Sequence, residues 1–437
     1  MPWWSGAAVT PTLSFDVHWR VPVGCGFSGF FTEVVLGYLP ALHALGINAR
    51  LLSGRCDDRW LSSHLEAHDA AVVRAAWLDE ASLTASQTRA ALAIEHGEPC
   101  GMRHWSPHGR PWRVIARAMS EGDLSPSNAR CLAGADEVWV PTQWHVERFV
   151  AAGVRHSSLF VMPEAVDTTF FSPEHPTAVS ARASRGASPP FVFVSVFKWE
   201  HRKGWDLLLD AYWKEFAPEV ASGRHVLLRL KTYLPSWEAG PRDLNDHLEM
   251  HARSHHTRRS ALPPVELLLD DASREGMRAM YAGSDAFVLP TRGEGWGLPI
   301  CEAMAMGLPA IATNFSGPTA FLTRANSHPL PVHRALPGGF AEPSVEALRR
   351  AMRAAFSERG TISGFERGKA ARADMVKRFS RDAVGKLLLA RLQAMSSVVE
   401  KHSGARGKRG GGYAGGNAGA GGTRRSGRQK KEELRVR

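Results

Sequence analysis

The sequence lacks several features that would place it quickly. Its five cysteines are scattered over 437 residues and never form a C-x-x-C pair, which favours free thiols in a reducing compartment over a disulfide framework. It has no run of about 18 apolar residues that could span a membrane. Its first residues, MPWWSGAAVTPTLSF, lack the basic start and continuous apolar stretch of a signal peptide. We therefore expect a cytoplasmic protein without a transmembrane segment or membrane anchor.

The net charge of +11 is concentrated at one end of the chain. Residues 401–437 contain eleven lysines and arginines against two acids, so the preceding 400 residues are close to neutral. The same segment is rich in glycine and has a single aromatic residue, Tyr413. We expect a disordered basic tail whose contact with nucleic acid or an anionic surface is at most weak, because aromatic stacking platforms are missing.

The rest of the chain alternates short β-rich apolar runs with helical patterns, which predicts parallel strands joined by crossover helices. The length favours two domains. We assign residues 1–171 to an N-terminal Rossmann-like domain and 191–380 to a second, C-terminal one. Residues 172–190, rich in Pro, Ser and Ala, are the expected linker, and a final helix is expected over 381–400. Two such domains face each other across a cleft.

The most informative stretch is GEGWGLPICEAMAMGLPAI, which begins at Gly293. It follows the predicted strand AFVLPT, and Pro299 and Gly307 mark the start and end of a helix. A helix start reached through a glycine-rich turn binds anions, yet Glu294 and Glu302 flank this one. Two carboxylates and an anion site together fit a nucleotide sugar, whose diphosphate lies between two hydroxyl-bearing sugars.

A second cluster, KWEHRKGWDLLL, follows the strand FVFVSVF and carries Lys198, Arg202 and Lys203. Cations at this strand end would neutralise the diphosphate and stabilise the charge that develops as it leaves.

In the first domain, the turn VPVGCGFSG holds Gly24 and Gly26 at a strand end facing the cleft, where either packing or substrate contact explains the glycines. The segment EHGEPCGMRHWSPHG spaces His96, Cys100, His104 and His108 by four residues, but Pro99, Gly101 and Pro107 would break a helix that aligned them. We therefore expect no metal site here. We instead place His96 and Glu98 on the acceptor and sugar side of the cleft.

These motifs resemble those of a known family. RGEGWGLPICEAMAMGLPAIAT is similar to the E-x(7)-E signature of retaining nucleotide-sugar glycosyltransferases with the GT-B fold, the glycosyl transferases group 1 type. HRKGWDLLL looks like its phosphate-binding segment, and VMPEAVDTTFFSP like the segment before its linker. The resemblance covers roughly residues 13–398 and is strongest over 191–322.

The resemblance implies a fold of two Rossmann-like, doubly wound domains, with 1–171 on the acceptor side and 191–380 binding the nucleotide sugar. It also implies that the final helix, 381–400, crosses back to the N-terminal domain, and it gives a role to each matching residue. Glu302 would hold the ribose hydroxyls and Glu294 the donor sugar, while Lys203 and Arg202 would act on the diphosphate. The donor site would be completed by Gly295, Trp296, Gly297, Leu298 and Lys198. A G-R pair usual in the family is replaced by Val196 and Phe197, so the arginine role is either missing or taken by Lys198 or Arg202. Ala165 stands where glycine is usual.

The predicted reaction is transfer of a hexosyl group from a nucleoside diphosphate sugar to a hydroxyl of a glycan, lipid or protein, with retention of configuration. We expect no cofactor and no metal at the donor site, because no strand-end D-x-D is present. Two alternatives stay open. One is a glycoside hydrolase that uses the two glutamates as acid and nucleophile. The other is a catalytically degenerate RNA-associated protein that acts through the basic tail.

Overall fold

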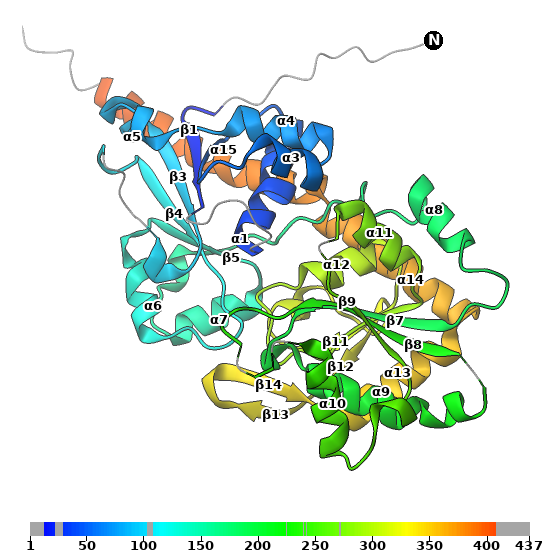
Figure 1. The fold of residues 1–437 in the computed structure, drawn as a ribbon. Coiled ribbons are helices and arrows are strands. Elements are labelled where there is room, and N and C mark those ends of the chain that lie inside the picture. Colours follow the sequence, from blue (N-terminus) through cyan, green and yellow to red (C-terminus); the bar gives the residue numbers. More distant parts are fainter. Residues whose placement is uncertain are drawn as a thin grey trace, which may run out of the picture.

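The computed structural model describes residues 13–21, 29–102, 108–223, 225–238, 240–241, 243–270 and 272–407, with side chains as far as 396. They form two α/β domains, each built on a six-stranded sheet (Figure 1). The predicted turn residues Gly24 and Gly26, as well as His104 and most of the basic tail, lie outside the described residues.

The sheet of the first domain is entirely parallel, in the order β2-β1-β3-β4-β5-β6. A bridge between Leu51 and Trp77 extends its β2 edge. Its strands are β1 (Asp16–Arg20), β2 (Arg50–Leu52), β3 (Ala91–His96), β4 (Arg113–Arg117), β5 (Glu137–Val140) and β6 (Leu159–Val161). All six residues of β3 are buried, as expected where helices cover both faces of a parallel sheet.

Helices of the first domain begin at good capping residues, such as Thr142 before α7 and Ser125 before α6. They are α1 (Gly29–Thr32), the π-helix η1 (Glu33–Tyr38), α2 (Leu39–Ala44), α3 (Asp58–His64), α4 (Ala67–Ala76), α5 (Ala85–Ala90), α6 (Pro126–Cys131) and α7 (Gln143–Ala151). Short 3-10 turns are η2 (Glu80–Ser82), η3 (Pro99–Gly101), η4 (Leu132–Gly134) and η5 (His156–Ser158).

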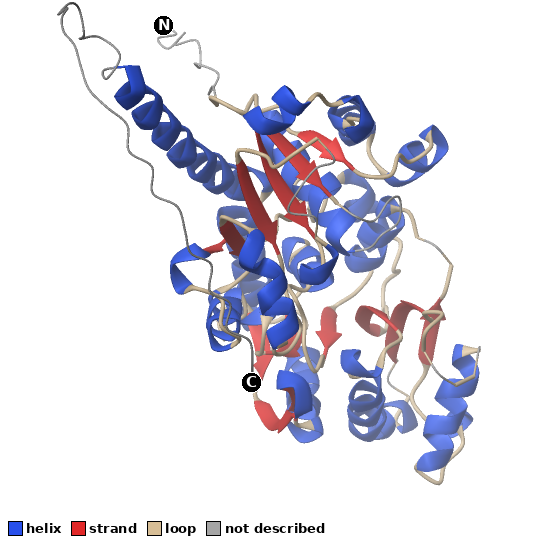
Figure 2. Ribbon diagram, turned by 90° about the vertical axis from the view of Figure 1, so that its left-hand side faces the viewer, coloured by secondary structure: helices blue, strands red, loops and turns tan. Residues whose placement is uncertain are grey.

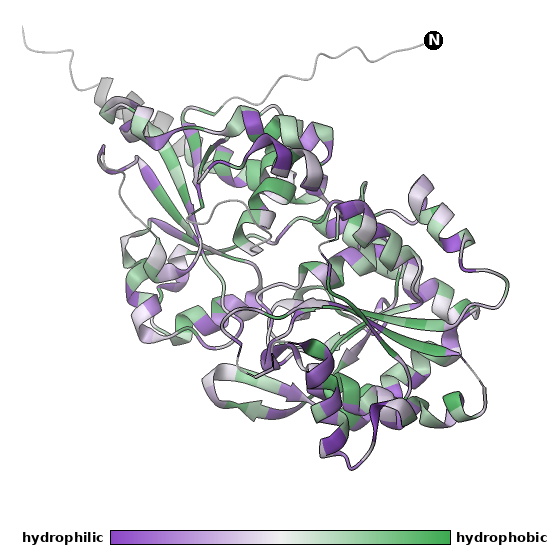
Figure 3. Cartoon of the chain, viewed as in Figure 1, coloured by the Kyte–Doolittle hydropathy of each residue, from purple (hydrophilic) through white to green (hydrophobic). Residues whose placement is uncertain are grey.

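The sheet of the second domain, also parallel, has the order β12-β11-β10-β7-β8-β9. This is the classic doubly wound order, and its switch point lies between β7 and β10. Its strands are β7 (Phe191–Lys198), β8 (Val226–Tyr233), β9 (Val265–Leu268), β10 (Ala286–Leu289), β11 (Ala310–Thr313) and β12 (Ser327–Leu330). Strand β7 is strongly apolar in Figure 3 and mostly buried, whereas β8 contributes alternate residues to the core.

The second domain also contains helices and a separate two-stranded antiparallel sheet, the hairpin of β13 (Val332–Leu336) with β14 (Phe340–Pro343). The helices are α8 (Pro176–Ala183), α9 (Trp205–Ala221), α10 (Leu244–Ser254), α11 (Arg274–Ala282), α12 (Leu298–Ala305), α13 (Val345–Glu358) and α14 (Ile362–Asp374). Shorter turns are η6 (His201–Lys203), η7 (Arg259–Ala261), η8 (Gly317–Ala320), η9 (Pro337–Gly339) and the π-helix η10 (Met375–Phe379).

The final helix, α15 (Arg381–Gly407), returns to the first domain (Figures 1 and 2). Val384, Leu388, Leu392 and Met395 repeat along one of its faces and belong to the core of the first domain. The two crossings between the domains lie side by side, because Val166 pairs with Ser380 in an isolated parallel bridge. Helix α15 therefore packs into the core of the first domain.

Residues 172–190, expected to be an irregular linker, contain helix α8. His175 caps it by accepting a hydrogen bond from the Thr177 amide, and Pro176 occupies its first turn. Ala178 is completely buried, and Arg278 of α11 donates to the Thr177 hydroxyl at 2.8 Å. The segment packs on the second domain. An eight-residue helix with little apolar periodicity is hard to recognise in a stretch rich in Pro and Ser.

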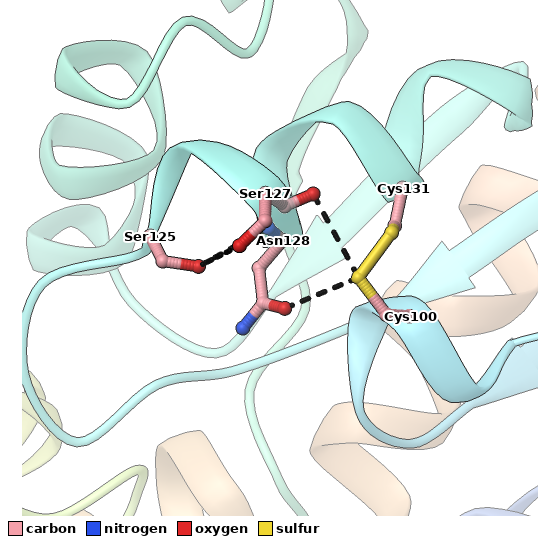
Figure 4. The surroundings of a disulfide bond; sticks show 5 residues. All are labelled: Cys100, Ser125, Ser127, Asn128 and Cys131. Carbon is pink, nitrogen blue, oxygen red and sulfur yellow. Dashed lines mark hydrogen bonds between the residues drawn. A yellow bond between two sulfur atoms is a disulfide. The ribbon is translucent and has the colours of Figure 1, made fainter.

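The expectation of free thiols throughout is wrong, because Cys100 and Cys131 form a disulfide (Figure 4). It joins η3 to the end of α6, across a sequence separation of 31 residues. Cys56 is also disulfide-bonded, while Cys301 is free and buried. Pairing at this separation depends on the fold and leaves no spacing signal. The thiol-based argument for a reducing compartment therefore fails.

In the described part of the chain, no helix is both long enough and apolar enough to cross a membrane.

Candidate functional site

The loops that follow β7 and β10 meet at the switch point of the second sheet. The backbone amide of Arg292 donates to the carbonyl of Arg202 at 2.7 Å, and the Arg202 guanidinium donates to the carbonyl of Gly293 at 2.7 Å. Gly204 allows this approach, because its φ is 71° and a Cβ there would lie 2.1 Å from the Pro290 carbonyl oxygen. Two segments 90 residues apart in the sequence thus build one surface.

Lys203 and Glu294 form the central ion pair of this surface, with Lys203 Nζ 2.5 Å from Glu294 Oε1. Arg202 Nη1 lies 3.9 Å from the same oxygen. Burial opposes ionisation of Glu294, but the charges of Lys203 and Arg202 outweigh it and lower its pKa. Burial lowers the pKa of Lys203 more than Glu294 raises it. The site therefore holds a carboxylate next to two cations. An anion bound here would interact with the same two cations.

Helix α12 begins next to this ion pair. Gly297, with φ of 107°, precedes its first residue Leu298, and Pro299 lies in its first turn. The amides of that turn lack acceptors within the helix, so they and the helix dipole favour an anion. The predicted helix start is confirmed. Trp296 is only 2% exposed and packs edge-on against Phe321 and Phe379.

Glu302 lies one turn into α12 and is partly buried. Its Oε2 accepts a hydrogen bond from the Tyr281 hydroxyl at 2.9 Å. Burial raises the pKa of Glu302 to about 7, against the opposing effects of Tyr281 and the positive charge of Arg274. Arg274 in turn is bound to Asp167 at 3.0 Å and lies 3.5 Å from Asp69 of the first domain. Glu302 is thus close to the charged network at the domain crossing.

Arg292 organises the surface, although the sequence analysis gave it no role. It is 4% exposed, and its two terminal nitrogens donate to both carboxylate oxygens of Asp206 at 2.8 and 2.7 Å. It also donates to Glu342 of β14 at 2.9 Å and to the carbonyl of His201 at 2.6 Å. Arg292 therefore ties the glycine-rich loop to η6, to the first turn of α9 and to the β13–β14 hairpin.

The first domain closes directly over the glycine-rich loop. A Cβ on Gly293 would lie 2.3 Å from the Glu121 carbonyl oxygen, and one on Gly295 2.2 Å from Met119 Sδ. Glu121 also pairs with Arg202 at 3.2 Å, and the Asp123 amide donates to the Gly338 carbonyl at 2.8 Å. These glycines permit close contact between the two domains. Glu294 beside them is only 7% exposed.

A surface hollow of about 1190 Å³ lies between α8, α13 and α14, and neither Glu294 nor Glu302 lines it. The candidate site is therefore defined by converging charged groups rather than by this hollow.

Part of the chain matches known proteins. Residues 188–350, which include β7 to β14, match the model of the family described as Glycosyl transferases group 1. The lipopolysaccharide core biosynthesis mannosyltransferase LpsB of Rhizobium meliloti (strain 1021) is 27% identical over 231 residues, covering 48% of this chain and 61% of that protein. This chain thus matches less than two thirds of that relative's length.

Solved structures match over most of the chain. A glycosyltransferase from Rickettsia africae superposes with a TM-score of 0.62 and 14% identity, covering 87% of this chain and 98% of that one. HepE from Anabaena, in complex with UDP-glucose, has a TM-score of 0.63 and 14% identity, covering 87% and 100%. The chain has the GT-B fold. The sequence-based prediction of the GT-B architecture, including the two Rossmann-like domains, is confirmed.

Within the GT-B fold, the predicted donor residues Arg202, Lys203 and Glu294 come together, and Glu302 lies on the adjoining helix. Lys198 lies at the end of β7 with its Nζ 5.7 Å from the centre of the Trp237 ring. Glu98 is exposed, and partial desolvation and the charge of Glu121 raise its pKa. It therefore belongs to the first-domain side of the site, as Glu121 does. The ligand roles of all these residues stay predictions.

His96 is completely buried within a charged cluster at the carboxyl ends of β3 and β4. Its Nε2 lies 3.0 Å from Glu33 Oε2, and its Nδ1 accepts from Trp19 Nε1 at 3.3 Å. Burial lowers its pKa despite the nearby Glu33 charge. A role on the acceptor stays a prediction, and any such role requires the ring to become accessible.

The sequence analysis missed the remaining members of this cluster. Arg117 lies 3.4 Å from Glu33, 3.5 Å from Glu164 and 3.2 Å from the Tyr38 hydroxyl. Glu33 and Tyr38 are five residues apart, and the π-helix η1 brings such positions onto one face. Burial and the repulsion of Glu33 raise the pKa of Glu164 well above its usual value, and Glu294 adds to this. The cluster therefore interacts electrostatically with Glu294 in the glycine-rich loop.

Glu302→Gln is expected to stabilise the protein more at pH 8 than at pH 5. The folded-state pKa of about 7 lies above the ordinary value of 4.5, so ionising Glu302 opposes folding. Below pH 4.5 the carboxyl is neutral in both states and burial costs no stability. As the pH rises from 4.5 to 7 the wild type loses stability, and above 7 the loss is complete. The difference amounts to at most about 3 kcal/mol. Glutamine keeps an acceptor for Tyr281, and denaturant unfolding of both proteins at each pH measures the effect. A stability difference independent of pH would show that Glu302 titrates normally.

Proposed function

We propose that the protein transfers a hexosyl group from a nucleoside diphosphate sugar to a hydroxyl acceptor, with retention of the anomeric configuration. The observation that carries this proposal is the convergence of Lys203, Arg202 and Glu294 at the start of α12, at the switch point where ligands of doubly wound sheets bind. The family match over residues 188–350 and the UDP-glucose complex of the structurally similar HepE support the same reading.

In this proposal the diphosphate lies over the first turn of α12, next to Lys203 and Arg202. When it binds, Lys203 exchanges part of its contact with Glu294 for phosphate oxygens, which frees Glu294 to accept hydrogen bonds from the donor sugar. Glu302 accepts hydrogen bonds from the ribose hydroxyls. Each carboxylate thus binds one hydroxyl-bearing end of the donor, and neither has to act as an acid or a nucleophile.

The bond between the anomeric carbon and the diphosphate oxygen then breaks, and the electron pair leaves with the diphosphate. Lys203, Arg202 and the amides of α12 stabilise this negative charge, which grows toward the transition state. The acceptor oxygen approaches the same face and forms the new bond, while its proton passes to the departing phosphate. The positive charge needed at the leaving group comes from the chain itself, so the proposed reaction requires no metal.

The glycoside hydrolase alternative is less well supported by the charges around Glu294. A nucleophilic carboxylate in a hydrolase faces a neutral sugar, whereas Glu294 is paired with two cations that suit an anionic ligand. The alternative based on RNA binding through the tail concerns residues that are mostly outside the described part of the chain.

The test is a thermal-shift screen against UDP-, GDP- and ADP-sugars, without added divalent metal, using the wild-type protein and Glu302→Ala. We expect at least one nucleotide class to raise the wild-type Tm, and Glu302→Ala to reduce this shift. Glu366→Ala, which removes an exposed glutamate on α14, is the matched control and should behave as the wild type. If no nucleotide sugar stabilises the wild type, or if Glu302→Ala responds equally, the proposed donor site is wrong.

A further inference from the structure

We propose that Asp210, His251 and His255 bind one Zn²⁺ ion between α9 and α10. Asp210 belongs to α9, His251 to α10, and His255 is the C-cap of α10. One ligand atom from each of the three residues lies within 4.8 Å of the other two. This site is separate from the donor site and goes beyond the proposed sugar transfer.

The two imidazoles converge on a single carboxylate oxygen. His251 Nε2 and His255 Nε2 each lie 2.8 Å from Asp210 Oδ1. The histidines are four residues apart, so they share one face of α10 and project toward α9. The three side chains are therefore already oriented by two packed helices, as the ligands of a metal site need to be.

The distances fit zinc after a small adjustment. Bonds from Zn²⁺ to imidazole nitrogen and carboxylate oxygen are about 2.0–2.2 Å, so tetrahedral ligand atoms lie about 3.3 Å apart. The Nε2 atoms would move away from Asp210 Oδ1 by about half an ångström. Two neutral imidazoles and one carboxylate are a ligand set that Zn²⁺ accepts. Because the side chain of His255 is 36% exposed, water can supply the fourth ligand.

Neighbouring groups are compatible with this assignment. Lys214 lies 3.8 Å from the other carboxylate oxygen, Asp210 Oδ2, and its side chain is 52% exposed, so it can move away from a bound cation. His247 precedes His251 by one turn, but its Nε2 lies 2.9 Å from the Pro241 carbonyl oxygen. His247 is therefore occupied elsewhere and provides a natural control.

The location gives such a metal a structural consequence. His251 packs against Trp205, the first residue of α9, and Trp205 stacks on Trp199 with ring centres 4.7 Å apart. Helix α9 directly follows η6, which carries Arg202 and Lys203. A zinc ion joining α9 to α10 would thus stabilise the start of α9. It would thereby help to position η6, whose Arg202 and Lys203 are the proposed diphosphate ligands.

The test uses tag-free, full-length protein that has been treated with a chelator and then dialysed. Calorimetric titration with ZnCl₂ is expected to show one tight site, and Zn²⁺ is expected to raise the Tm. His255→Ala removes one of the three ligands at a half-exposed position, so it should fold and bind Zn²⁺ at least about tenfold more weakly. Asp210→Asn should weaken binding similarly, and Co²⁺ in the wild-type site should give the intense visible absorption of tetrahedral coordination.

His247→Ala is the matched control, because it removes a histidine from the same helix without removing a proposed ligand. It should bind Zn²⁺ as the wild type does. Absence of a tight site in the wild type would overturn the proposal, as would equal affinity of the wild type and His255→Ala. A loss of binding in His247→Ala as large as in His255→Ala would overturn the ligand assignment. None of these measurements depends on sugar transfer, so a failure here is distinct from a failure of the proposed function.

Discussion

Lys203→Ala is expected to lower kcat for sugar transfer by about 100-fold or more. Removing one preorganised group that stabilises developing negative charge in a closed site costs about 10²–10³ in rate. Lys203 fits that description, because its ammonium lies 2.5 Å from Glu294 at the start of α12. Arg202 is a poorer substitute, since its guanidinium is already bound to Gly293, Glu200 and Glu121. The measurement is steady-state turnover with the donor found in the thermal-shift screen.

Two further variants separate catalysis from folding. Lys203→Ala leaves the buried Glu294 carboxylate with one cation fewer, which by itself destabilises the site. Lys203→Ala combined with Glu294→Gln removes that unpaired charge and should recover stability without recovering kcat. Lys386→Ala, on the exposed face of α15, should leave both unchanged. A kcat for Lys203→Ala within about threefold of the wild type would exclude Lys203 from leaving-group stabilisation.

The part of the site that sequence predicts best is the part made by local backbone signals. A short helix is delimited in the sequence by the turn from Gly293 to Gly297, by Pro299 at its start and by Gly307 after its end. The strand before this turn is a continuous apolar run. The basic segment with Lys203 follows β7, and the acidic segment with Glu294 follows β10. In a doubly wound sheet those two strands are neighbours at the switch point. Strand order in such sheets has few solutions, so the meeting of Lys203 and Glu294 could be anticipated.

The contacts that sequence does not predict are those between residues distant in the chain. The partners of Arg117, which are Glu33, Tyr38 and Glu164, come from a π-helix and a loop that no periodic pattern marks. The Cys100–Cys131 disulfide likewise depends on where η3 and α6 meet. At Gly293 and Gly295 the sequence does carry a signal, because glycine permits a close approach of another segment. The sequence alone does not show that this segment belongs to the first domain rather than to a ligand.

Arg292 shows why a residue with many buried hydrogen bonds can go unrecognised in the sequence. It stands immediately before the glycine-rich loop, where an arginine reads as one more cation for the diphosphate. The structure instead surrounds it with acceptors from η6, α9 and β14. Its guanidinium fork is matched to two carboxylates, and this matching depends on the β13–β14 hairpin folding back beside the loop.

Arg292→Ala is expected to reduce the free energy of unfolding by about 3–5 kcal/mol, because it breaks a buried ion-pair network and leaves its partners without their counter-charge. Burial opposes ionisation of Asp206, and the bonds from Arg292 overcome this to keep its pKa low. Without the arginine, Asp206 and Glu342 both lose that stabilisation. Denaturant unfolding measures the loss, and the donor-induced Tm shift should shrink as well, because η6 is no longer held to the glycine-rich loop.

Two controls define what this result would mean. Arg350→Ala removes a 69% exposed arginine that pairs with Glu346, and such a surface pair is worth about 0–1 kcal/mol. Arg292→Lys keeps the charge but cannot bind two carboxylates through a planar fork, so it should fall between the wild type and Arg292→Ala. If Arg292→Ala were no less stable than Arg350→Ala, the network would not hold the loop. The position of Lys203 would then depend on α9 and its contacts with α10 instead.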